Sequence, residues 1–278
     1  MDKLSIQCFF IFLVLTSFVT TVSCLSATTD SREVENEREF SYEQNKENGP
    51  SKWGKIKPEW AMCGKGDLQS PIDLTNKRVT IVTHFQKLTK DYKPCNATLI
   101  NRGHDMMLRF EGEGPGSFMV NGTDEYKLLQ LHWHSPSEHT INGRRFALEL
   151  HLVHENINGS LAVVTVLYKI GRPDSFLRSL EKKLSVITDQ SEAKKNVEMI
   201  DPKSIKIGSR KYYRYLGSLT TPPCTQNVIW TIVRKVRTVT RNQVRLLRVA
   251  VHDNYDTNAR PVQPINKRVV KLFTPKIR

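Results

Sequence analysis

Residues 130–154 constrain this chain of 278 residues more than any other stretch, because five of its eight histidines fall there. His132 and His134 are two residues apart. The side-chain period of a β-strand is two, so both imidazoles would project from one face. An Asn-Gly turn signal then leads into a second alternating segment, which carries His151. If the two segments pair as antiparallel neighbours, three imidazoles converge on one point.

Three neutral imidazoles with a fourth position left open are typical of a catalytic zinc site. A His-x-His pair alone is more often a polar stripe that faces solvent, so the metal hypothesis depends on the residues around it. Gln130 shares the face of His132, and Glu149 shares the face of His151. A metal-bound histidine usually donates its second N–H to such a partner. Under the alternative interpretation these are surface polar residues with no shared purpose.

Residues 1–24 have the features of a secretory signal peptide. Lys3 supplies a positive start, Cys8–Leu15 is an unbroken apolar run, and small residues precede Cys24. The apolar core is shorter than the about 20 residues that a membrane span needs, and no other stretch could cross a bilayer. The alternative is a buried N-terminal helix. The polar residues 25–39 then predict a flexible lead-in.

A protein that enters the secretory route can form disulfides and can be glycosylated at asparagine. After cleavage near Cys24, two of the three remaining cysteines are expected to pair in an oxidising compartment. Cysteine counting does not choose the pair among Cys63, Cys95 and Cys224. Three Asn-x-Ser/Thr sequons at turn-like positions are expected glycan sites: Asn96, Asn121 and Asn158.

Short apolar segments separated by turn signals predict a β-rich, mainly antiparallel fold. The length is ample for one large domain, although two small domains are possible on length alone. The expected strands cover residues 79–84, 98–101, 106–110, 117–120, 126–134, 146–154 and 161–169. Helical periodicity is expected over Ser175–Leu184 and over Arg241–Val249, the second with Thr240 as its N-cap.

The formal net charge is +14, and the excess is confined to one part of the chain. Residues 201–278 hold 17 Lys and Arg against 3 Asp and Glu, whereas residues 1–200 hold 25 of each. A basic surface could meet a nucleic acid, a wall polyanion or an anionic membrane. The aromatic residues there do not alternate with the basic ones as stacking platforms would. A solvated basic face is therefore the preferred interpretation, and no nucleic-acid partner is expected.

Several short motifs occur in a fixed order along the chain: Gln69–Ile72, Ser137–Ile141, Phe146, Glu149–Val153, Gly217–Cys224 and Asn258–Pro264. Together they resemble the signature of the α-type carbonic anhydrases, and in particular of the plant members. The resemblance covers about residues 40–275. It implies one domain over that range, mainly β, built around a large, twisted, mostly antiparallel sheet with peripheral short helices.

The activity that the resemblance implies is a zinc-dependent, reversible hydration of carbon dioxide to bicarbonate and a proton. Zinc-bound hydroxide would attack the carbon, and a histidine would carry the proton away. The implied cofactor is Zn²⁺, the partner is the small-molecule substrate, and sulfonamide inhibitors are expected to bind. A monomer, or a dimer linked through Cys95, is compatible with the sequence.

The resemblance also assigns roles to residues. The zinc ligands would be His132, His134 and His151, supported by Gln130, Glu149 and the backbone carbonyl of Asn258. Thr220 would orient the nucleophile and donate a hydrogen bond to the carboxylate of Glu138, which as an ion can only accept. The substrate pocket would be lined by Val153, Val163, Leu219, Thr221, Trp230 and Tyr42.

His104 takes the shuttle position of the family, and a histidine of near-neutral pKa suits that task. Arg102 and Met107 depart from the best-known animal enzymes, which carry asparagines there. Charge repulsion from Arg102 would lower the pKa of His104, which bears on the shuttle rate and leaves the hydration step unchanged. The resemblance further pairs Cys63 with Cys224, closing a long loop worth a few kcal/mol. Cys95 would remain as a buried thiol or an intermolecular link.

Two other classes of function stay open at this point. Some plant storage and lectin-like proteins resemble the same family without being catalysts, although the three candidate ligands are intact here. A zinc hydrolase would usually carry His-Glu-x-x-His on a helix, and the chain has no such motif. The expected location is the secretory pathway and the apoplast, with the chloroplast stroma, reached through that route, as the alternative.

Overall fold

The computed structural model describes residues 39–83, 88–188, 190, 192–208, 210–248 and 257–275. The predicted signal peptide, residues 1–24, lies outside the described residues, as does all but the last residue of the predicted lead-in. In the part of the chain that is described, no helix is long and apolar enough to cross a membrane.

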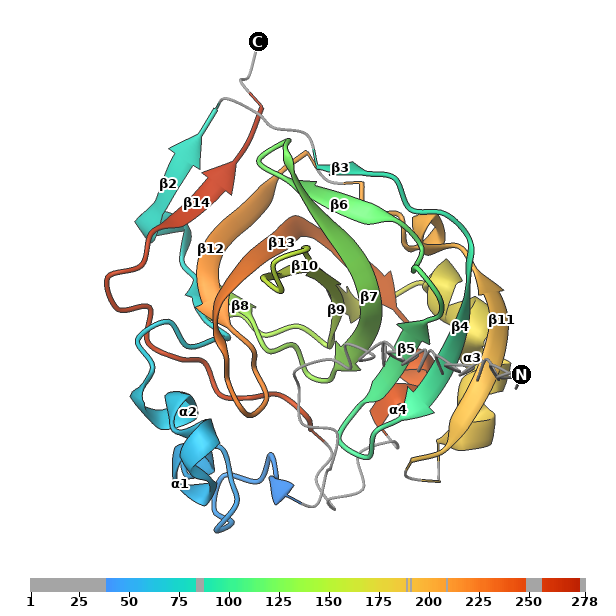
Figure 1. The fold of residues 1–278 in the computed structure, drawn as a ribbon, viewed down its shortest axis with the longest axis horizontal. Coiled ribbons are helices and arrows are strands. Elements are labelled where there is room, and N and C mark those ends of the chain that lie inside the picture. Colours follow the sequence, from blue (N-terminus) through green and yellow to red (C-terminus); the bar gives the residue numbers. More distant parts are fainter. Residues whose placement is uncertain are drawn as a thin grey trace, which may run out of the picture. The chain divides into compact units, whose positions relative to one another are not determined.

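One twelve-stranded sheet organises these residues (Figure 1). Its main path runs β11-β4-β5-β7-β9-β10-β13-β12-β14-β2, and β3 and β6 attach beside β7. The pairs β10–β13 and β14–β2 are parallel and the other pairs of this sheet are antiparallel, so the predicted mostly antiparallel sheet is confirmed. The strands of this sheet are β2 (Val79–Val82), β3 (Thr89–Lys90), β4 (Cys95–Asn101), β5 (Met106–Phe110), β6 (Ser117–Val120), β7 (Asp124–His134), β9 (Leu148–Glu155), β10 (Leu161–Ile170), β11 (Lys194–Ile200), β12 (Tyr212–Ser218), β13 (Gln226–Val239) and β14 (Val270–Phe273).

Smaller elements surround this sheet. A two-stranded parallel pair joins β1 (Asp73–Leu74) to β8 (Thr140–Ile141). The helices are α1 (Trp53–Ile56), α2 (Met62–Lys65), α3 (Ser175–Ile187) and α4 (Arg241–Arg248), with 3₁₀ turns η2 (Pro58–Trp60), η3 (Asn76–Arg78) and η4 (Pro202–Ile205). Helix α3 packs against β4, β11 and α4. The prediction of few, short, peripheral helices is therefore confirmed.

All seven predicted strands contain an observed strand, but the two-residue strands β1, β3 and β8 and the longer strands β11 to β14 were not predicted. Strand β13 explains why. Residues 228–233 of this strand are buried or nearly so on both faces, and a doubly covered strand loses the apolar–polar alternation that marks a half-exposed one. Its second half carries Arg234, Lys235 and Arg237, which further weakens the apolar pattern.

The two faces of the central strands carry different side chains. On β9, Leu148, Leu150 and Leu152 join the large apolar core that also receives helix α3. The alternate residues Glu149, His151 and Val153 point the other way and are equally buried. Burial on both faces is what forces polar residues of this strand into hydrogen-bonded arrangements, since an unpaired buried polar group is costly.

Both predicted helices form, and their N-termini are capped as sequence rules expect. The Asp174 carboxylate accepts from the backbone N–H groups of Phe176 and Leu177 at 2.9 and 3.1 Å. The Thr240 hydroxyl accepts from the N–H of Gln243 at 3.1 Å, so the predicted cap of α4 is confirmed. The apolar face predicted for α3 is buried in the core at Phe176, Leu177, Leu180 and Leu184.

The cysteines and sequons are placed as follows. A disulfide joins Cys63 to Cys224, the pairing that the family resemblance implied. Cys95 is half-buried, and its thiol donates to the carbonyl of Glu111 at 3.3 Å.

All three sequon asparagines are exposed, and Asn121 and Asn158 lie in turns. The expectation of a turn at Asn96 is wrong: it lies within β4, opposite Met199 of β11, with its side chain on the exposed face.

Buried His154 gives the fold a pH-dependent stability. Its Nδ1 lies 3.1 Å from the Ala162 carbonyl and its Nε2 lies 2.7 Å from the Tyr92 hydroxyl, so the ring is held neutral. Burial lowers the pKa of His154 from 6.5 to about 4. The unfolded chain binds this proton more readily. The contribution is therefore fully present above the unfolded pKa and is lost, by roughly 3 kcal/mol, as the pH falls toward about 4.

The comparison of wild type with His154→Asn isolates this contribution, because other groups are common to both proteins. Between about pH 7 and pH 4.5, we expect the free energy of unfolding of the wild type to fall more steeply than that of the variant, by about 2–3 kcal/mol. Denaturant unfolding at a series of pH values measures it. Parallel curves for the two proteins would contradict the neutral, buried state of His154.

Candidate active site

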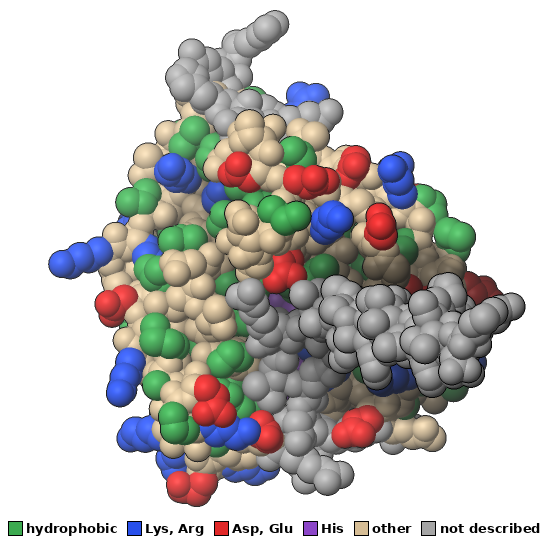
Figure 2. All heavy atoms as spheres, viewed as in Figure 1, with side chains coloured by type: hydrophobic (Ala, Val, Ile, Leu, Met, Phe, Trp, Pro, Cys, Tyr) green, Lys and Arg blue, Asp and Glu red, His purple; other side chains and the backbone are tan. Residues whose placement is uncertain are grey.

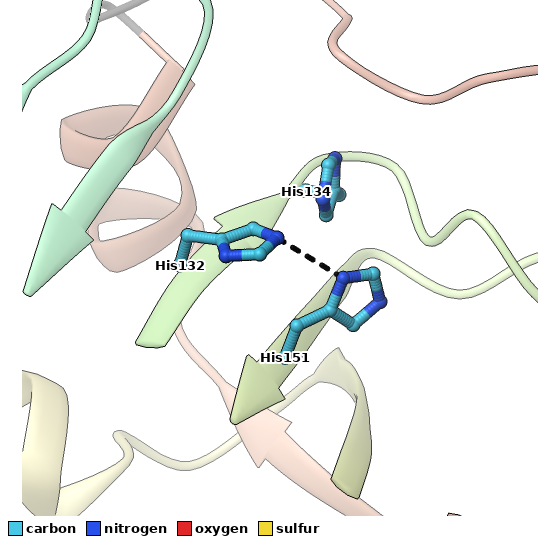
Figure 3. Close-up of side chains that lie close together, drawn as sticks. All are labelled: His132, His134 and His151. Atoms are coloured by element: carbon cyan, nitrogen blue, oxygen red, sulfur yellow. Dashed lines mark hydrogen bonds between the residues drawn. The ribbon is translucent and has the colours of Figure 1, made fainter. Parts of the chain in front are cut away.

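Three histidines from two neighbouring strands converge in the middle of the sheet. His132 and His134 lie on β7, His151 lies on β9, and the antiparallel register places His132 directly opposite His151. Their candidate ligand nitrogens all lie within 4.8 Å of one another, and all three side chains are buried. Figure 3 shows the three rings pointing toward one another. The predicted period-two pairing of the two segments is therefore what the structure contains.

Each ring has one nitrogen committed to a polar partner. The Nδ1 of His132 lies 2.9 Å from the side-chain oxygen of Gln130, and the Nδ1 of His134 lies 2.6 Å from the backbone carbonyl of Asn258. The Nε2 of His151 lies 2.7 Å from the carboxylate of Glu149. These partners are acceptors, so each committed nitrogen carries the proton and each remaining nitrogen exposes a lone pair.

The remaining nitrogens face one another in a way that suits a cation. The Nδ1 of His151 lies 3.2 Å from the Nε2 of His132, the contact drawn in Figure 3. With both protons placed on the far nitrogens, these are two acceptors in contact, and the buried Nε2 of His134 has no hydrogen-bond partner among the described residues. Zinc–nitrogen bonds of about 2.0–2.1 Å in a tetrahedron separate two ligands by about 3.4 Å. The donor set and its spacing therefore fit a tetrahedral metal ion.

The electrostatic setting keeps two of the rings neutral. Burial lowers the pKa of His132 and of His151, and the neighbouring histidines lower both further. At His134 burial also opposes the charge, but the carboxylates of Glu138 and Asp105 outweigh it and raise the pKa. The cluster thus favours a positive charge at His134, beside two neutral imidazoles that can act as metal ligands.

Glu138 lies next to the histidines and is fully buried. One carboxylate oxygen accepts from the backbone N–H of Arg260 at 2.9 Å. The other lies 3.6 Å from the Nε2 of His134 and has no hydrogen-bond partner among the described residues. A buried carboxylate oxygen without a donor is costly, so it is available for a hydroxyl donor. Thr220, the predicted donor, is buried at the start of the loop that Cys224 ties down.

A hydrogen-bonded chain extends from Glu149 away from the histidine cluster. The Nδ1 of His139 donates to Glu149 at 2.6 Å, and its Nε2 lies 2.7 Å from the hydroxyl of Tyr215. That hydroxyl lies 2.8 Å from the hydroxyl of Ser70. The chain holds the carboxylate that in turn orients His151. No role was predicted for His139, because its partners lie on other segments of the chain and local sequence carries no signal for them.

Arg260 is a second residue that sequence reasoning missed. Its guanidinium is buried and donates to the Gln69 side chain, to the Ser70 carbonyl and to the Cys63 carbonyl at 2.8 to 2.9 Å. Burial lowers the pKa of Arg260 to about 10, which leaves it charged at neutral pH. Because its backbone N–H holds Glu138, this residue links the N-terminal segments to the carboxylate.

The residues predicted to line the substrate pocket fall into two groups. Val153, Val163, Leu219 and Trp230 belong to one apolar cluster on the histidine face of the sheet, and the Trp230 ring lies 4.8 Å from the ring of His151. Thr221 is buried beside Thr220. Tyr42 instead packs in an aromatic cluster with Phe40, Trp53, Trp60 and the disulfide. On the face drawn in Figure 2, charged side chains of both signs lie around the rim, and histidine surface is visible near the middle.

His104 lies close to the cluster but is buried. Its ring packs 5.2 Å from that of Phe40, its carbonyl accepts from the Asn258 side chain, and its charge would interact with that of His134. Burial lowers the pKa of His104 to about 4, Asp105 opposes this, and Arg102 adds to it. The predicted direction of the Arg102 effect is therefore confirmed, and burial, which was not predicted, is the larger cause. The guanidinium of Arg102 forms a buried two-point ion pair with Asp105, at 2.6 and 2.8 Å.

Fold and site together define a strand-rich metal-binding protein whose ion would be held by three histidines of two adjacent strands. The model of the eukaryotic-type carbonic anhydrase family matches residues 48–274. The chain is 80% identical over 238 residues to alpha carbonic anhydrase 2 of Arabidopsis thaliana, covering 86% of this chain and 96% of that protein. The chain belongs to the eukaryotic-type, or α, carbonic anhydrase family.

Solved structures agree with this assignment. A crystal structure of dioscorin complexed with ascorbate matches with a TM-score of 0.83 at 45% identity, covering 86% of this chain and all of that one. The α-carbonic anhydrase from Thermovibrio ammonificans, in complex with the inhibitor sulfanilamide, matches with a TM-score of 0.76 at 33% identity. It covers 84% of this chain and 98% of that one.

The hydrogen bonds that join Glu149, His139 and Tyr215 lead to a prediction about zinc affinity. His139→Asn removes the imidazole donor to Glu149 and keeps the backbone N–H donor at 2.8 Å, so we expect Zn²⁺ affinity to fall by about 10-fold. Tyr215→Phe breaks only the far end of the chain and should cost less. Competition with a chelating dye measures the affinities. His154→Asn, a buried histidine outside the cluster, is the matched control, and an equal loss there would show that general destabilisation is responsible.

Proposed function

We propose that this protein is a zinc enzyme that catalyses the reversible hydration of carbon dioxide to bicarbonate and a proton. The observation that carries the proposal is the convergence of three imidazole lone pairs, each fixed by a hydrogen bond on the far side of its ring. Family membership supplies the reaction, and this geometry indicates that the donor set for the metal is intact.

Zn²⁺ would be held by the Nε2 of His132, the Nε2 of His134 and the Nδ1 of His151. When bound, a zinc ion supplies a Lewis acid that lowers the pKa of water to about 7 and so makes a nucleophile available at neutral pH. Gln130, Glu149 and Asn258 hold the three rings in the tautomers that leave those nitrogens free.

Thr220 and Glu138 would orient the nucleophile. The free oxygen of Glu138 can only accept, so it would fix the Thr220 hydroxyl as a donor toward the carboxylate. The threonine oxygen then accepts a hydrogen bond from the nucleophile and sets the direction of its lone pair. The backbone N–H of Arg260 donates to the other oxygen of Glu138 and so keeps the carboxylate from rotating.

Carbon dioxide is apolar, and the wall nearest His151 is apolar as well. Val153, Val163 and Trp230 face the same side of the sheet as His151 and are at most 3% exposed. They would exclude water from the reacting carbon and hold the substrate by packing alone, with Leu219 and Thr221 on the loop that follows β12. We assign Tyr42 to the wall of the same cavity, at the aromatic cluster.

The metal assignment is tested by substituting a ligand. We expect His132→Ala to lose bound zinc and CO2 hydration together, with activity falling by at least about 10³-fold. Zinc content by atomic absorption and stopped-flow hydration, with and without a sulfonamide, measure both. Gln130→Ala, which keeps all three ligands, should retain most zinc at saturating metal. A His132→Ala protein that hydrates CO2 at the wild-type rate would disprove the assignment.

We propose His104 as the group that exports the proton. Its pKa of about 4 lies well below that of the nucleophile, so proton transfer to it is uphill and export is the slow step in weak buffer. We expect imidazole to accelerate the wild type, and His104→Ala to be about tenfold slower in weak buffer and restored by imidazole. A variant that imidazole does not rescue would remove His104 from the mechanism.

We also propose the secretory pathway as the route of this protein, with a signal peptide over residues 1–24 and glycans at the three exposed sequons. The Cys63–Cys224 disulfide supports an oxidising compartment during folding. The apoplast, or the plastid reached through that route, would be the destination. Sulfonamides would bind this protein and inhibit it, since the Thermovibrio ammonificans relative forms a complex with the inhibitor sulfanilamide.

A further inference from the structure

A bulge in β13 separates the histidine site from the basic end of the sheet. Val166 of β10 pairs with Val233 of β13, and Tyr168 pairs with Arg237. Between these two pairs β10 advances by two residues, whereas β13 advances by four. The extra residues of β13 form a bulge, a feature that locally bends a strand away from its partner. The hollow that the bulge opens accounts for a cavity on this part of the sheet.

That cavity has a volume of about 340 Å³, within the size range of small-molecule sites. Its apolar lining includes Val166, Val233 and Ile207, which are at most 4% exposed and belong to the large core. These three side chains form a fixed base, and the more accessible Pro173 and Val236 supply the apolar surface that the body of an organic molecule can cover.

One guanidinium holds the walls of the cavity together. Arg237 donates to the Asp174 carboxylate at 2.8 Å, to the Ile205 carbonyl, and to the Lys206 carbonyl at 3.3 Å. These contacts join β13 to the N-terminus of α3 and to the end of η4. A cavity whose walls are already cross-linked loses little conformational freedom when it binds a ligand.

The charge of the lining is positive. Lys206, Lys235 and Arg237 line the cavity together with one carboxylate, that of Asp174, which pairs with Arg237 and accepts from two capping N–H groups. Lys206 and Lys235 are exposed, and within the described part of the chain no acceptor pairs with either ammonium group. Two cations on one apolar hollow repel each other and attract an anion.

We propose that this cavity is a binding site for a small organic anion that joins a phosphate or carboxylate group to an apolar body. The anionic group would lie between Lys206 and Lys235, and the apolar part would cover Pro173 and Val236. Such a site would give a function to part of the basic excess of residues 201–278. CO2 hydration does not explain this excess.

The site is separate from the histidine cluster and does not depend on the proposed function. Val163 and Trp230, beside the histidines, lie on one face of the same strand pair. Val166 and Val233, three residues along each strand, lie on the other face. A ligand in the cavity therefore leaves the three imidazoles uncovered.

Phenyl phosphate is a suitable probe, titrated into the full zinc-loaded protein with its valine methyl groups labelled for NMR. We expect the methyl resonances of Val166 and Val233 to shift saturably while those of Val153 and Val163 stay in place. Lys206→Gln/Lys235→Gln should weaken binding by about tenfold or more. The matched control Lys203→Gln/Lys271→Gln removes two exposed lysines of the same basic region outside the cavity, and should weaken it by less than about twofold.

Three results would overturn the proposal. The first is an absence of saturable shifts up to about 10 mM probe, which would make the cavity a solvent-filled hollow. The second is an equal loss of affinity in both double variants, because general electrostatic attraction would then be responsible. The third is equally tight binding of inorganic phosphate, which would show that the apolar lining contributes nothing.

Discussion

The site depends on the cost of burying polar groups in a sheet that is covered on both faces. Between β7 and β9, imidazoles and carboxylates lie where water cannot reach them, so each must find a partner within the protein. Most do: Gln130, Asn258 and Glu149 each take one nitrogen of a different histidine. At the three-histidine cluster itself, one lone pair on each ring and one oxygen of Glu138 remain. The satisfied bonds determine which atoms are left over, and the leftover atoms define the chemistry.

Much of this could be predicted from the sequence because strand periodicity is a local property. The two-residue spacing of His132 and His134, and the Asn-Gly turn before His151, are sufficient to place three rings on one face. Asn258 lies 124 residues from His134, and no local pattern connects them, so only the family resemblance indicated that contact. The chain from His139 through Tyr215 to Ser70 needs three segments packed together, and local sequence carries no signal for it.

The misjudged features share a physical origin in burial. Arg102 lowers the pKa of His104 as expected, but the burial of His104, which lowers that pKa more, was not predicted. Strands β12 and β13 were not predicted because doubly covered strands lack alternation. Asn96 was expected in a turn, but a sequon can also occupy the exposed face of a strand. Burial depends on the packed fold, and single-sequence patterns report it only indirectly.

The N-terminal lobe, residues 39–70, is connected to the Thr220 loop and to Glu138 by two separate links. The Cys63–Cys224 bond ties it covalently to the loop that begins at Thr220, and Arg260 connects its backbone at Cys63 and Ser70 to Glu138. Trp53 lies under the same guanidinium, 5.5 Å from it. In a chimaera assembled from two relatives, this lobe therefore has to come from the same parent as the residue 220 loop. Exchanging it as though it were a leader segment would separate the two halves of one hydrogen-bonded unit.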